Sequence, residues 1–321
     1  MFILLKKRTA KKNISEKYFI LFFAVIGAIG CGMIYIYNVI NSFNYDDLSS
    51  DSDNDTTEIS DNQSDADNMV LNVLLLGIDG VSKGDKGRSD SILIVSLNRR
   101  HKKIKIASIM RDTWVKIPGY SNDRINSAYS LGGPKLTIDT VERNFGIGID
   151  RYVSVNFDEF SKVVDNLGGI DIELTASEIA YINAHAADKQ KLKGSGTQHL
   201  SGSQTLQYAR DRDSPGSDYD RTERQRNIIV AGINKLKQAN LLQLTKIVSD
   251  IAPMVTTNFK TSEITQLSSN ALTYLDFETE QFRIPSDDNV ESKTIDQKMV
   301  LVIKDLGKAK KDLRKFLCIK E

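Results

Sequence analysis

The stretch from residue 18 to residue 43 most limits how this chain can fold, because it contains no charged side chain. It reads YFILFFAVIGAIGCGMIYIYNVINSF. A helix needs about 20 mostly apolar residues to cross the hydrocarbon core of a bilayer, so this stretch is long enough. It is longer than the apolar core of a typical signal peptide, and no clear small-residue cleavage site follows it. It therefore predicts one transmembrane helix, with a cleaved signal peptide as the alternative.

The residues before this stretch predict its orientation. Residues 1–17 form a basic tail that contains Lys6, Lys7, Arg8, Lys11, Lys12 and Lys17. Lysine and arginine beside a span remain on the cytoplasmic side of the membrane. We therefore predict a single-pass protein of the cell membrane, with a cytoplasmic tail and an extracellular C-terminal domain.

Residues 44–68 are acidic, contain no lysine or arginine, and include few apolar residues. Such a segment cannot bury enough apolar surface to offset the entropy that it would lose on ordering. Repulsion between its like charges favours an extended chain. We expect a disordered linker that holds the following domain away from the membrane.

Residues 69–321 alternate between strand-like and helix-like patterns. Apolar runs predict strands at 69–79, 90–98, 102–110, 150–157 and 170–175. Amphipathic spacing predicts a helix opened by the Gly-Gly-Pro of residues 132–134, a helix with Asp158 as its cap, a helix with Asp220 as its cap, and a last helix at 298–317. This alternation predicts one α/β domain, a layered α/β/α fold with a central mixed sheet.

Composition excludes several classes of function. The formal net charge is only +1, which argues against a nucleic-acid-binding surface. The two cysteines, Cys31 and Cys318, and the three histidines are scattered and show no metal-ligand spacing. These patterns argue against zinc hydrolysis and against cysteine catalysis.

Arginine and aspartate gather in three places next to predicted strand or helix ends. They are GIDG…GRSDS, with Asp79, Arg88 and Asp90; MRDTW, with Arg111 and Asp112; and residues 207–226, with Arg210, Arg212, Arg221, Arg224 and Arg226. Each alone has a plainer interpretation, namely a flexible turn, a structural ion pair or a solvated helix start. Together, arginine forks and paired carboxylates suit a pyrophosphate bridged by Mg²⁺.

The motifs from Asn72 to Ile233, including NVLLLGID, RSDSILIVSLN, KIKIASIMRDTW, RINSAY and LQYARDR…DRTERQR, resemble the LytR-CpsA-Psr family of cell-wall ligases. The resemblance implies an Mg²⁺-assisted phosphotransferase that moves a glycopolymer from a polyprenyl-pyrophosphate carrier onto peptidoglycan, as in attachment of wall teichoic acid or capsule. It also implies a hydrophobic cavity for the lipid tail, and allows pyrophosphatase activity.

The resemblance assigns roles to particular residues. Asp79 and Asp90 match the metal-binding aspartates, and the pyrophosphate-binding side chains match Arg88, Arg111, Arg210, Arg212, Arg221 and Gln225. Arg88, Asp90 and Arg111 are the predicted catalytic residues, with Asp90 as the proton acceptor. Asp112 is expected to orient Arg111, and Arg224 is a weaker pyrophosphate candidate.

Three residues depart from the family pattern: Met110 in place of a frequent proline, Asp220 in place of glycine and Arg226 in place of glutamine. The last two are expected to add charge near the pyrophosphate.

A non-catalytic protein that binds lipid-linked anionic polymers, or regulates envelope assembly, is the alternative function, because arginines alone would serve it. A membrane-tethered transcription attenuator conflicts with the predicted topology. For the lipid groove, the helices near 136–145 and 160–167 are candidates.

Overall fold

The computed structural model describes residues 42–48, 69–79, 86–187, 191–212, 214 and 218–318 of the 321-residue chain. Residues 43–321 form one compact unit. The predicted cytoplasmic tail, nearly all of the predicted span and most of the predicted acidic linker lie outside the described residues. Within those ranges, no helix has the length and apolar character that a membrane span requires.

A seven-stranded mixed sheet forms the centre of the domain. Its strands follow the order β1 (Asn44–Tyr45), β10 (Thr256–Thr257), β7 (Arg151–Asn156), β2 (Val70–Asp79), β3 (Arg88–Asn98), β4 (Lys103–Ile109) and β11 (Glu278–Ile284). Strands β2, β3 and β4 are antiparallel, whereas β7 runs parallel to β2 and β11 runs parallel to β4. The predicted mixed α/β sheet is therefore confirmed.

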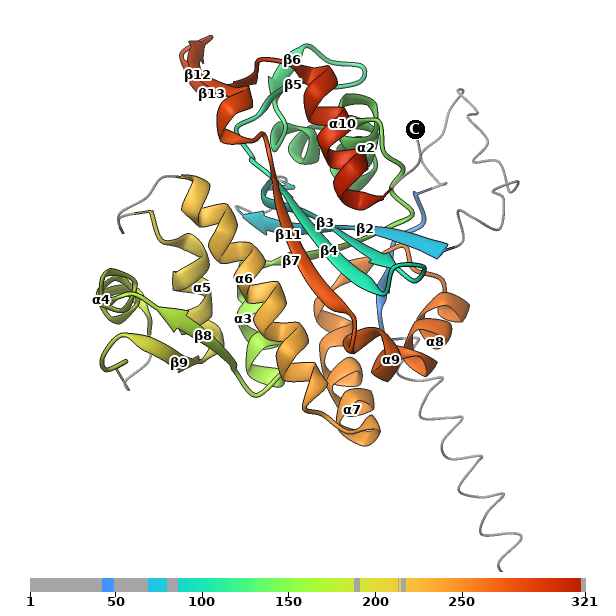
Figure 1. Ribbon diagram of the computed structural model, residues 1–321, viewed down its shortest axis with the longest axis vertical. Coiled ribbons are helices and arrows are strands. Elements are labelled where there is room, and N and C mark those ends of the chain that lie inside the picture. The colour runs from blue at the N-terminus through green and yellow to red at the C-terminus, as the bar shows by residue number, and fades with distance from the viewer. Residues whose placement is uncertain are drawn as a thin grey trace, which may run out of the picture. The chain divides into compact units, whose positions relative to one another are not determined.

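Helices cover both faces of this sheet (Figure 1). Successive side chains of a strand point to opposite faces. Ile92 and Ile94 of β3 pack into a core with helices α2 (Ser127–Phe145) and α10 (Leu306–Leu317). Leu93 and Val95 pack on the other face, in a cluster with α6 (Asp218–Lys237). A strand buried on both faces explains the near-continuous apolar run in the sequence.

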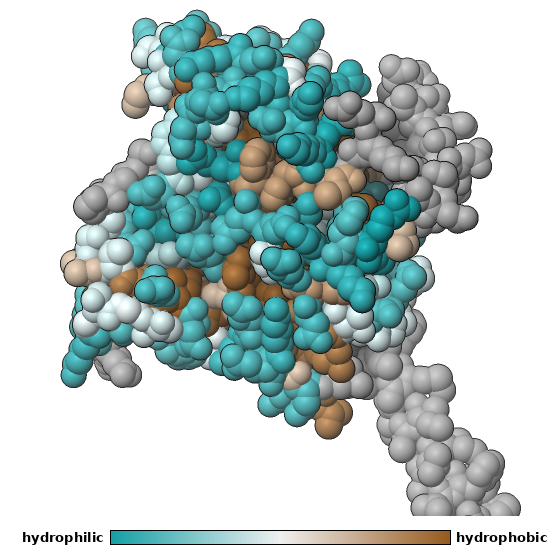
Figure 2. Space-filling view, in the orientation of Figure 1, coloured by the Kyte–Doolittle hydropathy of each residue, from teal (hydrophilic) through white to brown (hydrophobic). Residues whose placement is uncertain are grey.

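A second apolar cluster lies beside the sheet. It joins α6 to helices α3 (Phe157–Asn166), α4 (Ala176–His185) and α5 (Gly202–Arg210) and to the hairpin of β8 (Ile170–Leu174) and β9 (Gly196–Leu200). Helices α7 (Leu241–Ile251), α8 (Thr261–Ser269) and α9 (Ala271–Leu275) complete this side. The face shown in Figure 2 is mostly hydrophilic, with hydrophobic residues in its middle and lower parts.

Two predicted helix starts are wrong. The cap of α3 is Asn156, whose side chain accepts from the backbone N–H of Glu159 at 2.9 Å, so Asp158 lies in the first turn. Helix α6 begins at Asp218, so Asp220 also lies within the helix. In α2, the non-helical Gly132 and Gly133 separate a first segment that starts at Ser127 from a second that opens at the Gly-Gly-Pro, as predicted, and the first segment was missed. Local side-chain hydrogen bonds, rather than the charge of the nearest aspartate, determine where α3 starts.

The prediction of one helix over 298–317 is also wrong at its beginning. Residues Lys298–Ile303 form β13, which pairs with β12 (Val290–Ile295), and α10 starts only at Leu306. Asp296 and Gln297 form the two-residue turn between the strands, both with positive φ. Such turns usually contain glycine or asparagine, so this sequence gives little sign of the hairpin.

Two further elements have no counterpart in the sequence analysis. A short hairpin joins β5 (Trp114–Lys116) and β6 (Asn122–Arg124). Strand β1 contains the first residues of the predicted disordered linker, and Asp46 continues this contact by donating its backbone N–H to the carbonyl of Thr257 at 2.9 Å. The chain is therefore tied to the sheet edge where it enters the domain.

Candidate functional site

Three strand ends meet at one edge of the sheet. Asp79 ends β2 and lies opposite Arg88, which begins the antiparallel β3. Arg111 follows β4, which ends at the same edge because β4 is antiparallel to β3. Residues that are distant in sequence are thus brought together by the strand pairing alone.

Asp90 owes its position to an irregularity in this pairing. Gly77 pairs with Ser91, but the next residue, Ile78, pairs with Ser89, so Asp90 has no partner on β2. Such a β-bulge redirects a side chain out of the regular alternation. Asp90 can therefore face the strand ends although it lies within a strand.

Helices α5 and α6 bring further cationic side chains to the same place. Arg210 is the last residue of α5, and Arg212 follows two residues later. Arg221 and Gln225 are four residues apart on α6, so they lie on the same helix face. Gln225 accepts a hydrogen bond from the Ser91 hydroxyl at 3.1 Å, which fixes α6 against β3.

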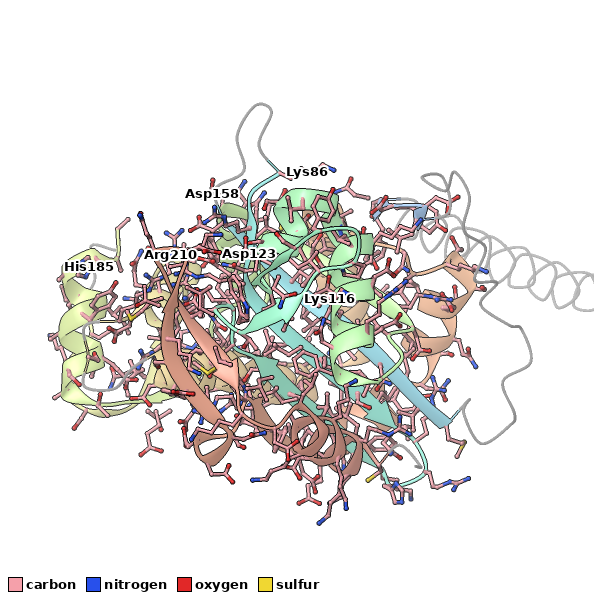
Figure 3. The ribbon with its side chains drawn as sticks, turned by 90° about the horizontal axis from the view of Figure 1, so that it is seen from above. Lys86, Lys116, Asp123, Asp158, His185 and Arg210 are labelled. Atoms are coloured by element: carbon pink, nitrogen blue, oxygen red, sulfur yellow. The ribbon has the colours of Figure 1, made fainter. Side chains whose placement is uncertain are left out.

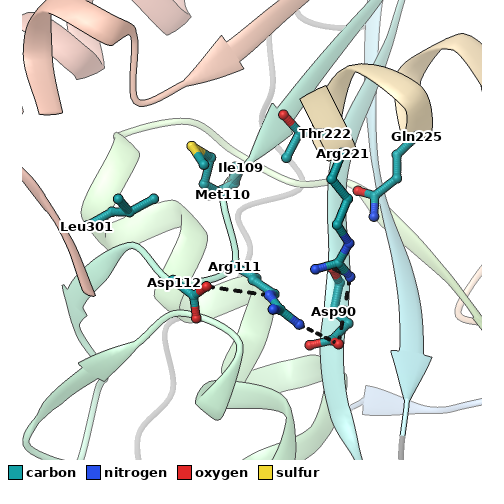
Figure 4. Close-up of a pocket in the computed structure, with 9 residues that line it drawn as sticks. All are labelled: Asp90, Ile109, Met110, Arg111, Asp112, Arg221, Thr222, Gln225 and Leu301. Carbon is teal, nitrogen blue, oxygen red and sulfur yellow. Dashed lines mark hydrogen bonds and ion pairs between the residues drawn. The ribbon is translucent and has the colours of Figure 1, made fainter. Parts of the chain in front are cut away.

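Ion pairs connect these groups around two carboxylates, Asp90 and Asp79, and Figure 4 shows those at Asp90. Asp90 Oδ2 lies 2.6 Å from Arg111 Nη1 and 3.7 Å from Arg221 Nη2. The side chain of Arg221 is only 5% exposed, and its guanidinium also donates to the backbone carbonyl of Asp90 at 3.1 Å. On the other side, Arg210 Nη2 lies 3.3 Å from Asp79 Oδ1.

Asp112 contacts the arginine that precedes it. Its Oδ2 lies 3.5 Å from Arg111 Nε, and its Oδ1 lies 3.3 Å from Arg124 Nε. Arg111 is thus held between two carboxylates, Asp90 and Asp112. This contact is the one expected of a residue that orients Arg111.

Two cavities open beside these residues. The first, which we call the arginine cavity, has a volume of about 290 Å³ and is lined by Asp79, Asp90, Phe157, Tyr181, Arg210, Arg212 and Arg221. The second, which we call the hairpin cavity, has a volume of about 330 Å³ and is lined by Asp79, Gly87, Arg88, Asp90, Arg111, Asp112, Arg124 and Asn126. Asp79 and Asp90 line both. Apart from Gln225 and the weaker candidate Arg224, every predicted site residue lines at least one of them. Gln225 lines a narrow space with Asp90, Arg111 and Arg221.

Several lining residues were missed by sequence reasoning. Phe157 lies under Arg210, with the guanidinium carbon 4.2 Å from the ring centroid, a distance typical of a cation–π contact. Tyr181 comes from α4, which was not predicted. Arg124 and Asn126 belong to the RINSAY motif, whose conspicuous arginine and asparagine offered a signal that was not used.

Two arginines of the charged stretch lie outside both cavities. Arg224 is 4% exposed and donates to the backbone carbonyl of Asp211 at 2.5 Å and to Glu178 Oε1 at 3.5 Å. It therefore holds the turn between Arg210 and Arg212. Arg226 donates to Ser108 and Gln281 on β4 and β11, so the expectation that it adds charge near the pyrophosphate is wrong. Burial lowers the pKa of Arg226 to about 10.

The candidate lipid-binding helices differ in what they leave accessible. Val141 and Phe145 of α2 are fully buried in the core, so this face of α2 holds no groove. Phe160 and Leu167, from the second candidate stretch, are only partly buried beside the second apolar cluster. Leu136, from the first stretch, is also only partly buried, so both stretches retain some accessible apolar surface.

The carboxylates are suited to Mg²⁺ by number and type. Mg²⁺ usually binds one or two protein carboxylates together with substrate phosphates and water. Asp79 and Asp90 line both cavities, and the side chain of Asp79 is 46% exposed. No group of three or more His, Cys, Asp or Glu side chains forms a cation site within the described residues. The donor set therefore fits a substrate-bridged magnesium ion better than a site built wholly from protein ligands.

Comparison with known families identifies the chain. A model described as the LytR_cpsA_psr family matches residues 34–315. This chain belongs to that family. Two curated relatives are polyisoprenyl-teichoic acid–peptidoglycan teichoic acid transferases. TagV from Bacillus subtilis (strain 168) is 34% identical over 262 residues, covering 78% of this chain and 66% of TagV. TagU from Bacillus mycoides (strain KBAB4) is 32% identical over 281 residues, covering 83% and 87%.

Solved structures of the LytR-CpsA-Psr family share the fold. One, described as TagT bound to LIIa-WTA, aligns with a TM-score of 0.67 and 27% identity over 81% of this chain and 95% of the other. Another, described as the family protein YwtF (TagT) with bound octaprenyl pyrophosphate lipid, aligns with a TM-score of 0.63 and 26% identity over 81% and 95%. This chain spans about two thirds of the length of the TagV relative.

Proposed function

We propose that this protein is a phosphotransferase that moves a glycopolymer from a polyprenyl-pyrophosphate carrier onto peptidoglycan. The convergence of five arginines on two aspartates carries the proposal: Arg88, Arg111, Arg210, Arg212 and Arg221 line cavities that share Asp79 and Asp90. Arginine forks bind phosphate oxygens in pairs and remain charged in any environment. The names of the TagU and TagV relatives and of the TagT structure with octaprenyl pyrophosphate support the substrate class.

The reaction requires the exchange of one phosphorus–oxygen bond for another. A hydroxyl oxygen of the acceptor attacks the phosphorus that is bonded to the glycopolymer. The bond from this phosphorus to the bridging oxygen breaks, and polyprenyl phosphate leaves with that oxygen. Asp90 is the proposed acceptor of the hydroxyl proton. If water replaces the acceptor, the same steps hydrolyse the pyrophosphate.

The arginines stabilise the charge that develops in this reaction. Positioned cationic groups around the transferring phosphoryl supply much of the rate enhancement in phosphoryl transfer. Arg210 and Arg212 are proposed to hold the pyrophosphate, with Arg221 and Gln225 on α6 behind it. Arg88 and Arg111 are proposed to contact the phosphoryl group being transferred.

Asp79 and Asp90 are proposed to hold Mg²⁺ together with the substrate phosphates. When bound there, the ion would offset phosphate charge at the reacting centre. The two side chains would exchange part of their pairing with Arg210 and Arg111 for the metal. Those guanidinium groups would then be available to the phosphate oxygens.

The predicted topology agrees with this substrate. A carrier lipid is confined to the membrane, so a domain anchored by the 18–43 span and lying outside the cytoplasm would meet it there. Strand β1 follows the predicted span directly in the sequence and pairs with β10 at the edge of the sheet. The partly buried apolar surface near Phe160 and Leu167 is a proposed contact for the lipid tail.

Arginine substitutions test the proposal. Arg88→Ala and Arg210→Ala should each reduce transfer of a polyprenyl-pyrophosphate-linked saccharide to peptidoglycan by roughly 100-fold or more, the typical cost of removing one transition-state charge contact. Lys246→Ala, at an exposed position of α7, is the matched control and should transfer at the wild-type rate. Wild-type transfer by both arginine variants, with the fold intact, would contradict the proposal.

A non-catalytic role remains the second candidate, because the relative MsrR of Staphylococcus aureus (strain Mu50 / ATCC 700699) is named a regulatory protein and is 34% identical over 197 residues. A binding protein needs the arginines but not the two carboxylates. Asp79→Asn and Asp90→Asn should abolish transfer if the protein is an enzyme. Retained binding of octaprenyl pyrophosphate with no transfer, even by the wild-type protein, would favour the regulatory role.

A further inference from the structure

The arginine cavity and the hairpin cavity differ in charge although they share two carboxylates. Three arginines and the shared Asp79 and Asp90 line the arginine cavity, which leaves an excess of positive charge. Three arginines and three aspartates line the hairpin cavity, so its charges balance by number. Most of them are also paired directly, through Arg111 with Asp90 and through Arg124 with Asp112.

The two cavities also differ in their uncharged lining. Phe157 and Tyr181 bring aromatic rings to the arginine cavity. The hairpin cavity instead has Asn126, which is 4% exposed and donates its amide N–H to Asp90 Oδ1 at 3.4 Å. This contact fixes the orientation of the amide. The other end, Oδ1, is buried and has no hydrogen-bond partner among the described residues.

A buried carbonyl oxygen without a donor needs an explanation, because such groups are costly and few. A phosphate cannot satisfy it, since phosphate oxygens accept hydrogen bonds rather than donate them. A hydroxyl group can donate to it, directly or through one water molecule. Because Asn126 lines the hairpin cavity, a hydroxyl-bearing ligand that reaches this oxygen would satisfy it where a phosphate would not.

Arg124 of the β5–β6 hairpin lines this cavity, and the β12–β13 hairpin supports that hairpin from behind. Arg124 of β6 donates to the backbone carbonyl of Met299 on β13 through Nε at 3.1 Å and Nη2 at 2.7 Å. Asp123, labelled in Figure 3, accepts from Lys298 Nζ at 2.8 Å. The backbone carbonyl of Asp112, two residues before β5, accepts the backbone N–H of Leu301 on β13 at 2.9 Å. The β12–β13 hairpin thus holds the β5–β6 hairpin in place beside the cavity.

We propose that the hairpin cavity binds the acceptor, a saccharide whose attacking hydroxyl is oriented by Asn126 next to Asp90, while the arginine cavity binds the donor pyrophosphate. In phosphoryl transfer the attacking and leaving oxygens lie roughly in line on opposite sides of phosphorus. Two cavities that meet at Asp79 and Asp90 can place the two oxygens around one phosphorus. A volume of about 330 Å³ lies within the range of small-ligand pockets, about 300–1,000 Å³.

This assignment rests on the proposed transferase function, and its test separates the two substrates. The full-length protein is assayed with an octaprenyl-pyrophosphate-linked disaccharide as donor and a soluble peptidoglycan glycan fragment as acceptor. Rates are measured against the concentration of each, and binding of octaprenyl pyrophosphate is measured separately. Asn126→Ala should raise the acceptor concentration that gives the half-maximal rate by about tenfold, the effect of one lost hydrogen bond. The dissociation constant of octaprenyl pyrophosphate should not rise with it.

A matched variant on the other side should show the opposite pattern. Arg212→Ala should weaken octaprenyl pyrophosphate binding without the same rise in the acceptor concentration. Arg124→Lys, which loses the paired contact with the Met299 carbonyl but keeps the charge, is the second acceptor-side variant if Asn126→Ala does not fold. Weaker donor binding with unchanged acceptor dependence in the acceptor-side variants would overturn the assignment. Absence of transfer by the wild-type protein would instead refute the proposed function.

Discussion

Gly202 provides a strong test of how the site is supported, although it lies at the opposite end of α5 from Arg210. A Cβ atom added to Gly202 would lie 1.9 Å from the backbone carbonyl oxygen of Ser161 on α3. Real Cβ contacts are essentially never shorter than 3.0 Å, so the backbones of α3 and α5 must separate by at least about 1 Å. The contacting atom belongs to the backbone, so no side-chain rotation can relieve the clash.

The expected cost of Gly202→Ala has two parts. Overpacking of this kind destabilises a protein by about 1–3 kcal/mol. Helix α5 carries Arg210 at its C-terminal end, so a shift of the helix also displaces the proposed pyrophosphate contact. A misplacement of about 1 Å at a reacting centre can cost roughly 100-fold in rate. Both a lower melting temperature and a large loss of transfer are therefore expected.

Gly232→Ala is the matched control, because an added Cβ on this α6 residue meets no atom within 4 Å. Alanine is favoured over glycine in a helix interior by about 0.5–1 kcal/mol, so this variant should be slightly more stable and fully active. Thermal denaturation and the transfer assay measure the two effects for both variants. A Gly202→Ala protein with wild-type stability and rate would refute the proposed packing of α5 on α3.

Three further predictions concern parts of the fold outside the two cavities. Arg226→Gln should change stability but not octaprenyl pyrophosphate binding, measured by thermal denaturation and a binding assay, because Arg226 faces β4 and β11. Burial raises the pKa of Glu142, so its ionisation destabilises the fold as pH rises from the unfolded-state pKa through the folded-state pKa. The melting temperature of Glu142→Gln should therefore gain on that of the wild type across this pH window. Burial alone would raise the pKa of Asp123, but the hydrogen bond from Lys298 holds this pKa below its ordinary value. The ionised Asp123 therefore stabilises the fold above about pH 4, and this stabilisation is lost as pH falls through the folded-state pKa. The loss should appear as a change in the fluorescence of Trp114, the single tryptophan, on the strand paired with that of Asp123. Lys298→Ala should move the midpoint of this change to higher pH.

The sheet could be predicted from the sequence because its strands are buried on both faces and leave uninterrupted apolar runs. The ends of those runs also indicated where Asp79 and Arg111 would lie. The bulge that turns Asp90 toward them leaves no such trace, since it depends on a one-residue shift in pairing between β2 and β3. Residue chemistry and the resemblance to the LytR-CpsA-Psr family both named Asp90 as a candidate magnesium ligand, but neither indicated the bulge that positions it.

The hairpins could not be predicted for a different reason. Strand β13 is short, its turn uses Asp296 and Gln297 in place of glycine, and its pattern of apolar residues continues into α10. Its position is fixed by tertiary contacts with Arg124 and Asp112, which are more than 170 residues away. Long-range pairings of this kind are invisible to a reading of local periodicity.

The charged stretch of residues 207–226 shows why composition alone did not separate ligand-binding arginines from structural ones. Arg221 and Arg224 are three residues apart on one helix and are both nearly inaccessible. Arg221 pairs with Asp90, whereas Arg224 donates hydrogen bonds to the backbone carbonyl of Asp211 and to Glu178. What distinguishes them is the partner that each meets across the fold. Because Arg224 holds the turn between Arg210 and Arg212, the geometry of the proposed pyrophosphate grip depends on an arginine that contacts neither cavity.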